Sequence, residues 1–94
     1  MKVVYNSKFV PKGYKAWVIY PYMFFSEAKC TDVLFRHELQ HVYQVRKYGW
    51  FKFYATYLWY SATKGYWDNP YEIEARGVQN TPLTQEERRL KEKK

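Results

Sequence analysis

Residues 31–49 read TDVLFRHELQHVYQVRKYG, and this stretch predicts a long helix around which the rest of the chain must fold. Thr31 is a good N-cap, and Asp32 places a carboxylate in the first turn, where the helix dipole favours negative charge. Gly49 suits the position just past the helix end. Five residues recur at spacings of three and four and so share one face: Leu34, His37, His41, Val45 and Tyr48.

The centre of this helix carries a pattern that chelates metal ions, His37-Glu38-Leu39-Gln40-His41. The chain has 2 histidines, and a helix stacks them one turn apart on the same face. Two imidazoles at that separation can hold one zinc ion, while Glu38 stands where it can handle the proton of a metal-bound water. A hydrolytic zinc site also needs a third protein ligand and an open position.

A second helix, expected from about residue 70 to 79, offers the third ligand. Asn69 suits its N-cap and Pro70 its first helical position. Glu72 and Glu74 both follow, but a helix directs positions two apart to different sides, so only one of them can face the histidines. Cys30 is a soft candidate for a fourth ligand, although a small buried residue near a helix start is the plainer interpretation.

The remaining sequence predicts a short N-terminal sheet and further helices, and hence one small, mostly helical α+β domain over residues 1–94. Strands are expected within about residues 1–25, at 3–5 and 16–20, with 22–25 continuing as an edge strand after Pro21. An aromatic helix is expected over about 50–63. A charged tail follows at 81–94, in which Thr84 and Glu87 suggest a last helix.

Composition limits the class of protein and its partners. Aromatic residues make up 22% of the 94 residues, which supplies a core and argues against a disordered chain. The formal net charge is +7, and its concentration in residues 88–94 is more typical of a solvated tail than of a nucleic-acid contact. With a single cysteine, no signal peptide and no transmembrane segment in view, we expect a cytoplasmic protein.

The two helices together resemble those of gluzincin-type zinc metallopeptidases, in which an H-E-x-x-H helix is followed by a helix bearing a ligand glutamate. The similarity is to minimal scaffolds of about this length, the minigluzincins, and residues 37–44, HELQHVYQ, resemble a form found in small bacterial and phage-encoded proteins. The family pattern E-x-x-A-D implies Glu72 as ligand and Ala75 as the small residue between the helices. Arg76 replaces an aspartate that commonly supports a ligand histidine, which leaves that support to Glu74 or a backbone carbonyl.

This resemblance implies a zincin-like fold, with the sheet packed on the H-E-x-x-H helix, and zinc-dependent hydrolysis of peptide bonds in a peptide or protein substrate. One zinc ion would be held by His37, His41 and Glu72. Glu38 would take the proton of the bound water and pass it to the leaving amine, and Tyr71 or Tyr66 would stabilise the oxyanion. Residues 16–25 would pair with the extended substrate as an added strand.

Two alternatives remain open from the sequence. The chain can be a zinc-binding domain without turnover, either degenerate or latent because residues 81–94 lie in the cleft. It can instead be an interaction module whose basic tail and aromatic surface contact nucleic acid or another protein. Hydrolysis that depends on Glu38 distinguishes the peptidase from both.

Overall fold

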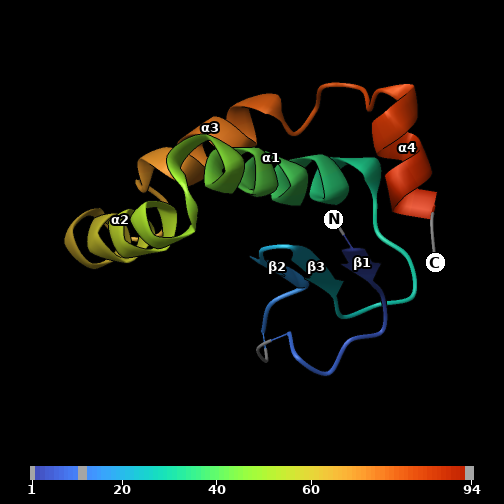
Figure 1. Ribbon diagram of the computed structural model, residues 1–94, viewed down its shortest axis with the longest axis horizontal. Helices are drawn as coiled ribbons and strands as arrows, with labels where there is room; N and C mark the ends of the chain where they lie inside the picture. The colour runs from blue at the N-terminus through green and yellow to red at the C-terminus, as the bar shows by residue number, and fades with distance from the viewer. Residues whose placement is uncertain (1, 11–12, 93–94) are drawn as a thin grey trace.

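The computed structural model describes residues 2–10 and 13–92, which form a three-stranded sheet and four helices (Figure 1). The α+β class predicted from the sequence is confirmed. The elements are β1 (Lys2–Val4), β2 (Ala16–Ile19), β3 (Tyr22–Phe25), α1 (Asp32–Tyr48), α2 (Trp50–Lys64), α3 (Pro70–Val78) and α4 (Gln85–Glu92).

The sheet has the order β1-β3-β2, with β1 parallel and β2 antiparallel to β3. Met23 therefore lies opposite Val3 on one side and Val18 on the other. The expectation that residues 22–25 form an edge strand is wrong, because β1 pairs along them and makes β3 central. Pro21 falls in the turn between β2 and β3, so its missing N–H costs the ladder nothing. The free edge near α1 belongs to β2.

Helix α1 has the ends that its sequence predicts. The Thr31 side chain accepts a hydrogen bond from the Leu34 backbone N–H at 3.1 Å. At the other end Gly49 has a φ of 87°, a conformation that favours glycine, and its N–H donates to the Val45 carbonyl at 2.8 Å. The inner face of α1 lies over the sheet, and the two share one core: Ala16, Met23, Phe25, Phe35, Leu39, Val42 and Leu83.

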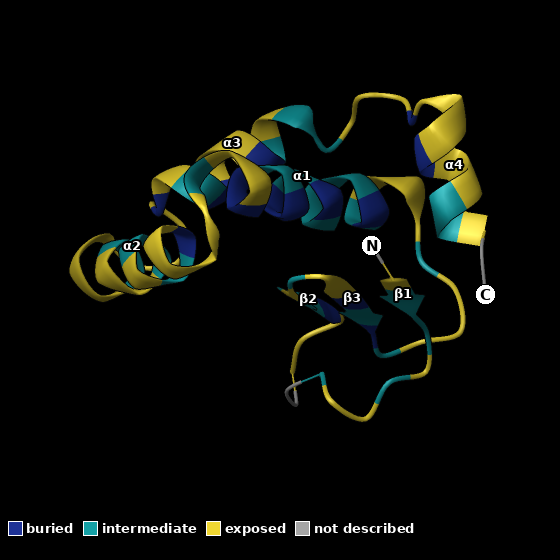
Figure 2. Cartoon of the chain, viewed as in Figure 1, coloured by how far each residue is buried: buried dark blue, intermediate teal, exposed yellow. Residues whose placement is uncertain are grey.

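The other helices attach to α1 in different ways (Figure 2). Helix α3 runs along α1 with Ala75 fully buried at the contact, as expected of a small residue between two helices. Helix α2 projects from one end of the molecule, and Phe53 is the one buried residue among its 15, all of which are described. None of the helices in the described residues is long and apolar enough to cross a membrane.

The C-terminal segment forms a helix through the capping pattern seen in its sequence. The Thr84 hydroxyl accepts from the Glu87 N–H at 3.2 Å, and the Glu87 carboxylate accepts from the Thr84 N–H at 2.9 Å. The same carboxylate accepts hydrogen bonds from the side chains of Arg36 and Tyr43. Helix α4 is therefore tied to the outer side of α1. The described residues of the tail, 81–92, line neither of the cavities described below.

Candidate metal centre

Two helices bring three metal-ligating side chains together. His37 and His41 lie one turn apart on α1, with ring centroids separated by 5.2 Å. Glu72 comes from the first turn of α3 and is 2% exposed. The start of α3 is fixed by the buried Asn69, whose side chain accepts from the Tyr71 N–H at 2.9 Å and donates to the Tyr57 carbonyl at 3.1 Å. The N-cap of α3 therefore also anchors that helix to α2.

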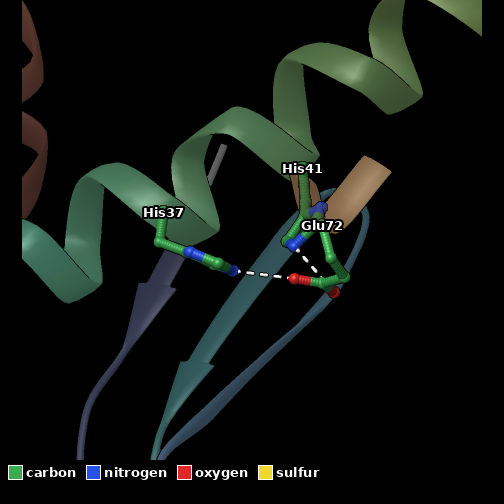
Figure 3. Close-up of side chains that lie close together, drawn as sticks. All are labelled: His37, His41 and Glu72. Carbon is green, nitrogen blue, oxygen red and sulfur yellow. Dashed lines mark hydrogen bonds and ion pairs between the residues drawn. The ribbon is translucent and has the colours of Figure 1, made fainter. Parts of the chain in front are cut away.

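The geometry of this cluster suits one metal ion (Figure 3). The Glu72 carboxylate lies 2.8 Å from His37 Nε2 and 3.2 Å from His41 Nε2. One ligand atom from each residue falls within 4.8 Å of the others. Zinc bonds of about 2.0–2.1 Å in a tetrahedron separate ligand atoms by about 3.3 Å, and two imidazoles with one carboxylate are a known donor set for catalytic zinc. The residues present therefore fit the ion.

Two glutamines hold the histidine rings. His37 Nδ1 lies 2.8 Å from Gln79 Oε1, and His41 Nδ1 lies 2.8 Å from Gln44 Oε1. An amide oxygen only accepts, so each Nδ1 carries the hydrogen, and Nε2 is the atom that each ring directs toward Glu72. The orientation of Gln44 is fixed in turn, because its amide nitrogen donates to the Tyr71 carbonyl at 3.0 Å and to Glu74 at 3.0 Å.

The sequence predicts Glu74 or a backbone carbonyl in this supporting role, and that prediction is wrong, because Gln44 and Gln79 are the partners of the two histidines. Glu74 lies one step further out, where it accepts hydrogen bonds from Gln40 at 2.8 Å and from Gln44. It is therefore not part of the three-residue cluster. Gln44 was visible in the HELQHVYQ string, but a glutamine on a helix flank carries no sign that it is buried. Gln79 lies at the C-cap of α3, and nothing in the surrounding sequence indicates that it supports a histidine.

Cys30, the soft candidate for a fourth ligand, also lies outside the cluster among the described residues. Its thiol is half-buried and lies 4.0 Å from the Tyr5 hydroxyl. Burial raises the pKa of the Cys30 thiol. A protonated thiol is a poor metal ligand, which agrees with the plainer interpretation of Cys30 as a core residue.

Charge is concentrated where the three ligands meet. Burial by itself would raise the pKa of Glu72, but hydrogen bonds from His37 and His41 outweigh it and hold that pKa far below its ordinary value. Burial would likewise lower the pKa of His41, yet the bond to Glu72 raises it. The Tyr57 hydroxyl donates a further hydrogen bond to Glu72. Tyr57 lies within the aromatic helix expected over about 50–63, and nothing in the sequence indicates that its hydroxyl reaches the metal centre.

Glu38 lies between two cavities that meet at the cluster. The cavity of about 660 Å³ is also lined by His37, Gln79 and two lysines, Lys15 and Lys29. The cavity of about 720 Å³ is also lined by His41, Glu72 and mostly aromatic side chains: Trp17, Phe53, Tyr54, Tyr57 and Leu58. Burial raises the pKa of Glu38 and outweighs the positive charges of His41 and His37, which lower it. A carboxyl group with a raised pKa beside open space is suited to exchanging a proton with a bound molecule.

The two tyrosines named as oxyanion stabilisers are placed differently. Tyr66 lines both cavities, and burial together with the charges of Glu72 and Glu38 raises its pKa to about 12. Its hydroxyl therefore keeps its hydrogen for donation. The ring of Tyr71 packs against Phe53, with centroids 4.9 Å apart, and lines neither cavity. Of the two, the structure leaves Tyr66 at the site.

No protein-family model, no curated protein and no solved structure matches this chain. The gluzincin resemblance therefore stays a prediction, and function has to be inferred from the geometry of the site.

Proposed function

We propose that this chain is a small zinc-dependent peptidase of the gluzincin type. The observation that carries the proposal is the convergence of His37, His41 and Glu72 from two helices, with Glu38 beside them at the junction of two cavities. A structural zinc site normally fills all four positions with protein ligands, and the described residues offer three. Three ligands and accessible space favour a site that acts on a substrate.

The residues of the chain divide the chemistry among them. A bound zinc ion would act as a Lewis acid toward the scissile carbonyl and would acidify water. Glu38 takes a proton from the attacking water and returns it to the leaving amine, and burial, which raises the pKa of Glu38, favours its holding that proton between the two steps. Tyr66 donates its hydroxyl hydrogen to the carbonyl oxygen as negative charge develops there.

The free edge of β2 supplies a place for an extended peptide. The Tyr54 hydroxyl donates to the Val18 carbonyl at 3.0 Å and accepts from the Tyr20 N–H at 3.1 Å, so these groups face away from β3. Ala16, two residues before Val18, then presents its N–H and C=O in the same outward direction, and it lines both cavities. A substrate strand pairs at Ala16, whereas the Tyr54 hydroxyl occupies the edge from the Val18 carbonyl to the Tyr20 N–H.

The nucleic-acid alternative is weakened by the way the basic tail is used. Lys91 and Arg88 lie 2.8 and 3.3 Å from the two carboxylate oxygens of Asp32, at the start of α1. Cations that are paired within the protein neutralise phosphates less well.

The test is metal content and turnover measured on the same preparations. We expect near-stoichiometric zinc by elemental analysis in the parent and in Glu74→Ala, and loss of zinc in Glu72→Ala. We expect chelator-sensitive cleavage of a quenched-fluorescence peptide library by the parent, and its loss in Glu38→Gln with zinc retained. A parent that takes up no zinc, or cleavage that survives Glu38→Gln, would rule out the proposal.

A further inference from the structure

The outward side of α2 is apolar and uncovered. Phe51, Ala55, Leu58 and Ala62 follow one another at helical spacing, and Trp50 and Trp59 border this stripe. These six residues are called the α2 face. Its large side chains are exposed to 56% at Trp50, 79% at Phe51, 69% at Leu58 and 65% at Trp59. Figure 2 shows α2 at one end of the molecule with most of its surface exposed. Single exposed apolar residues are ordinary, but a continuous helix face is not.

The charges on α2 all have one sign. Lys52 and Lys64 are the charged residues of the helix, whose sequence WFKFYATYLWYSATK contains no acidic residue. Lys47 precedes the helix, and the chain as a whole carries a formal charge of +7. An apolar stripe bordered by tryptophan and lysine, without acidic residues, matches a surface that is apolar inside and anionic outside.

We propose that the α2 face docks on the surface of an anionic lipid bilayer. The helix has 15 residues, and a rise of 1.5 Å per residue makes it about 22 Å long, which is shorter than a hydrocarbon core of about 30 Å. It therefore lies in the interface, with Phe51 and Leu58 pointing into the acyl boundary and the tryptophan rings at headgroup level.

The same charges disfavour a second copy of the chain as the occupant. Two α2 faces packed together bring Lys52 of both copies to one interface, and the helix has no carboxylate to pair with them. Lipid phosphates provide the missing negative charge. The α2 face meets the larger cavity at Trp50 and Leu58, whereas Phe51 and Trp59 line neither cavity, so substitutions at Phe51 and Trp59 test docking apart from the metal centre.

The test is co-sedimentation of the full chain with vesicles, either phosphatidylcholine alone or an equal mixture with phosphatidylglycerol. We expect partitioning into the anionic vesicles that falls as salt is raised. Phe51→Asp and Trp59→Asp each lower it about tenfold or more, as expected for withdrawing a large apolar side chain. Lys52→Gln lowers it about fivefold, the equivalent of about 1 kcal/mol for one lysine near the surface.

The matched control is Ile73→Asp, which makes the same kind of change at an exposed apolar residue of α3. It should bind vesicles like the parent, and circular dichroism should show that all variants fold. Absence of binding by the folded parent overturns the proposal. Equal, salt-independent binding to neutral vesicles also overturns it. So does concentration-dependent self-association that Phe51→Asp abolishes, since the occupant is then a second copy.

Discussion

Each histidine of the cluster has its own glutamine, and this arrangement predicts how single substitutions change metal affinity. In Gln44→Leu and Gln79→Leu, one imidazole loses the acceptor that fixes its Nδ1 hydrogen. Loss of such a supporting bond costs about 10–100-fold in metal affinity. Competition with a chromogenic chelator measures this loss. Gln85→Leu, an exposed change on α4, is the control, and equal affinities in all three variants would mean that other contacts set the ring orientation.

The same residues show what a sequence can predict about the site. His37, Glu38 and His41 belong to one helix, so the helical period alone fixes their relation. Glu72 lies 35 positions from His37, and Gln79 lies 42 positions from it. Those contacts depend on how α3 lies along α1, which local pattern does not determine. Only the resemblance to the family pattern favours Glu72 over Glu74. Nothing in the sequence distinguishes Tyr57 from the other aromatic residues of its helix.

At the scale of elements, one hydroxyl group joins α2 to the sheet. Tyr54 bonds the Val18 carbonyl and the Tyr20 N–H, so Tyr54→Phe leaves two backbone groups without this partner. We expect the free energy of unfolding in urea to fall by about 1–3 kcal/mol. Tyr22→Phe removes a hydroxyl from an exposed tyrosine on β3 and should change little. If the two variants lose the same stability, the Tyr54 hydroxyl does not hold α2 on β2.

The Glu87 carboxylate is one of the groups that hold helix α4 on α1, and its charge gives the docking of α4 a pH dependence. Burial opposes the charge of Glu87, but bonds from the Thr84 N–H and from Tyr43 and Arg36 lower its pKa below the ordinary value of 4.5. A lowered folded-state pKa adds stability that is complete above the unfolded value and is lost as pH falls through the folded one.

The free energy of unfolding should therefore decline below about pH 4.5 more steeply in the parent than in Glu87→Gln. Urea titrations at a series of pH values measure this difference. Glu86→Gln, an exposed change on the same helix, should follow the parent. Identical pH profiles for the parent and Glu87→Gln would show that this carboxylate does not tie α4 to α1.

The elements also differ in how far the sequence could locate them. Thr31, Gly49, Gly65 and Asn69 mark helix ends through local backbone chemistry, and α1, α2 and α3 begin and end within one residue of the expected positions. The order of the sheet was not predictable in this way. The pairing of β1 with β3 joins residues 20 positions apart, such as Lys2 and Tyr22. The two strands are parallel, so a crossover connection links them and no tight turn in the sequence marks their pairing.

At the scale of the whole molecule, the cluster joins α1 to α3, which also meet at Ala75 and through the hydrogen bonds of Gln40 and Gln44, so a metal ion should stabilise the fold. A chain of 94 residues buries a modest core, and a ligand that binds only the folded state adds stability by mass action. Free zinc at about 100 times its dissociation constant contributes about 2.7 kcal/mol. Each kcal/mol raises the midpoint of a domain this size by about 4–8 °C, so zinc should shift thermal unfolding upward by about 10–20 °C.

The rise in the unfolding midpoint should depend on the three ligand residues and not on binding of zinc elsewhere on the protein surface. Differential scanning fluorimetry of the chelator-treated chain, with and without added zinc, gives the shift for each variant against its own metal-free midpoint. Glu72→Ala should lose most of it, because the bridge between α1 and α3 is then missing, while Glu74→Ala should keep most of it. An equal shift in the parent and in Glu72→Ala would place the zinc somewhere else on the surface. No shift in the parent would mean that the cluster holds α1 to α3 through its hydrogen bonds alone.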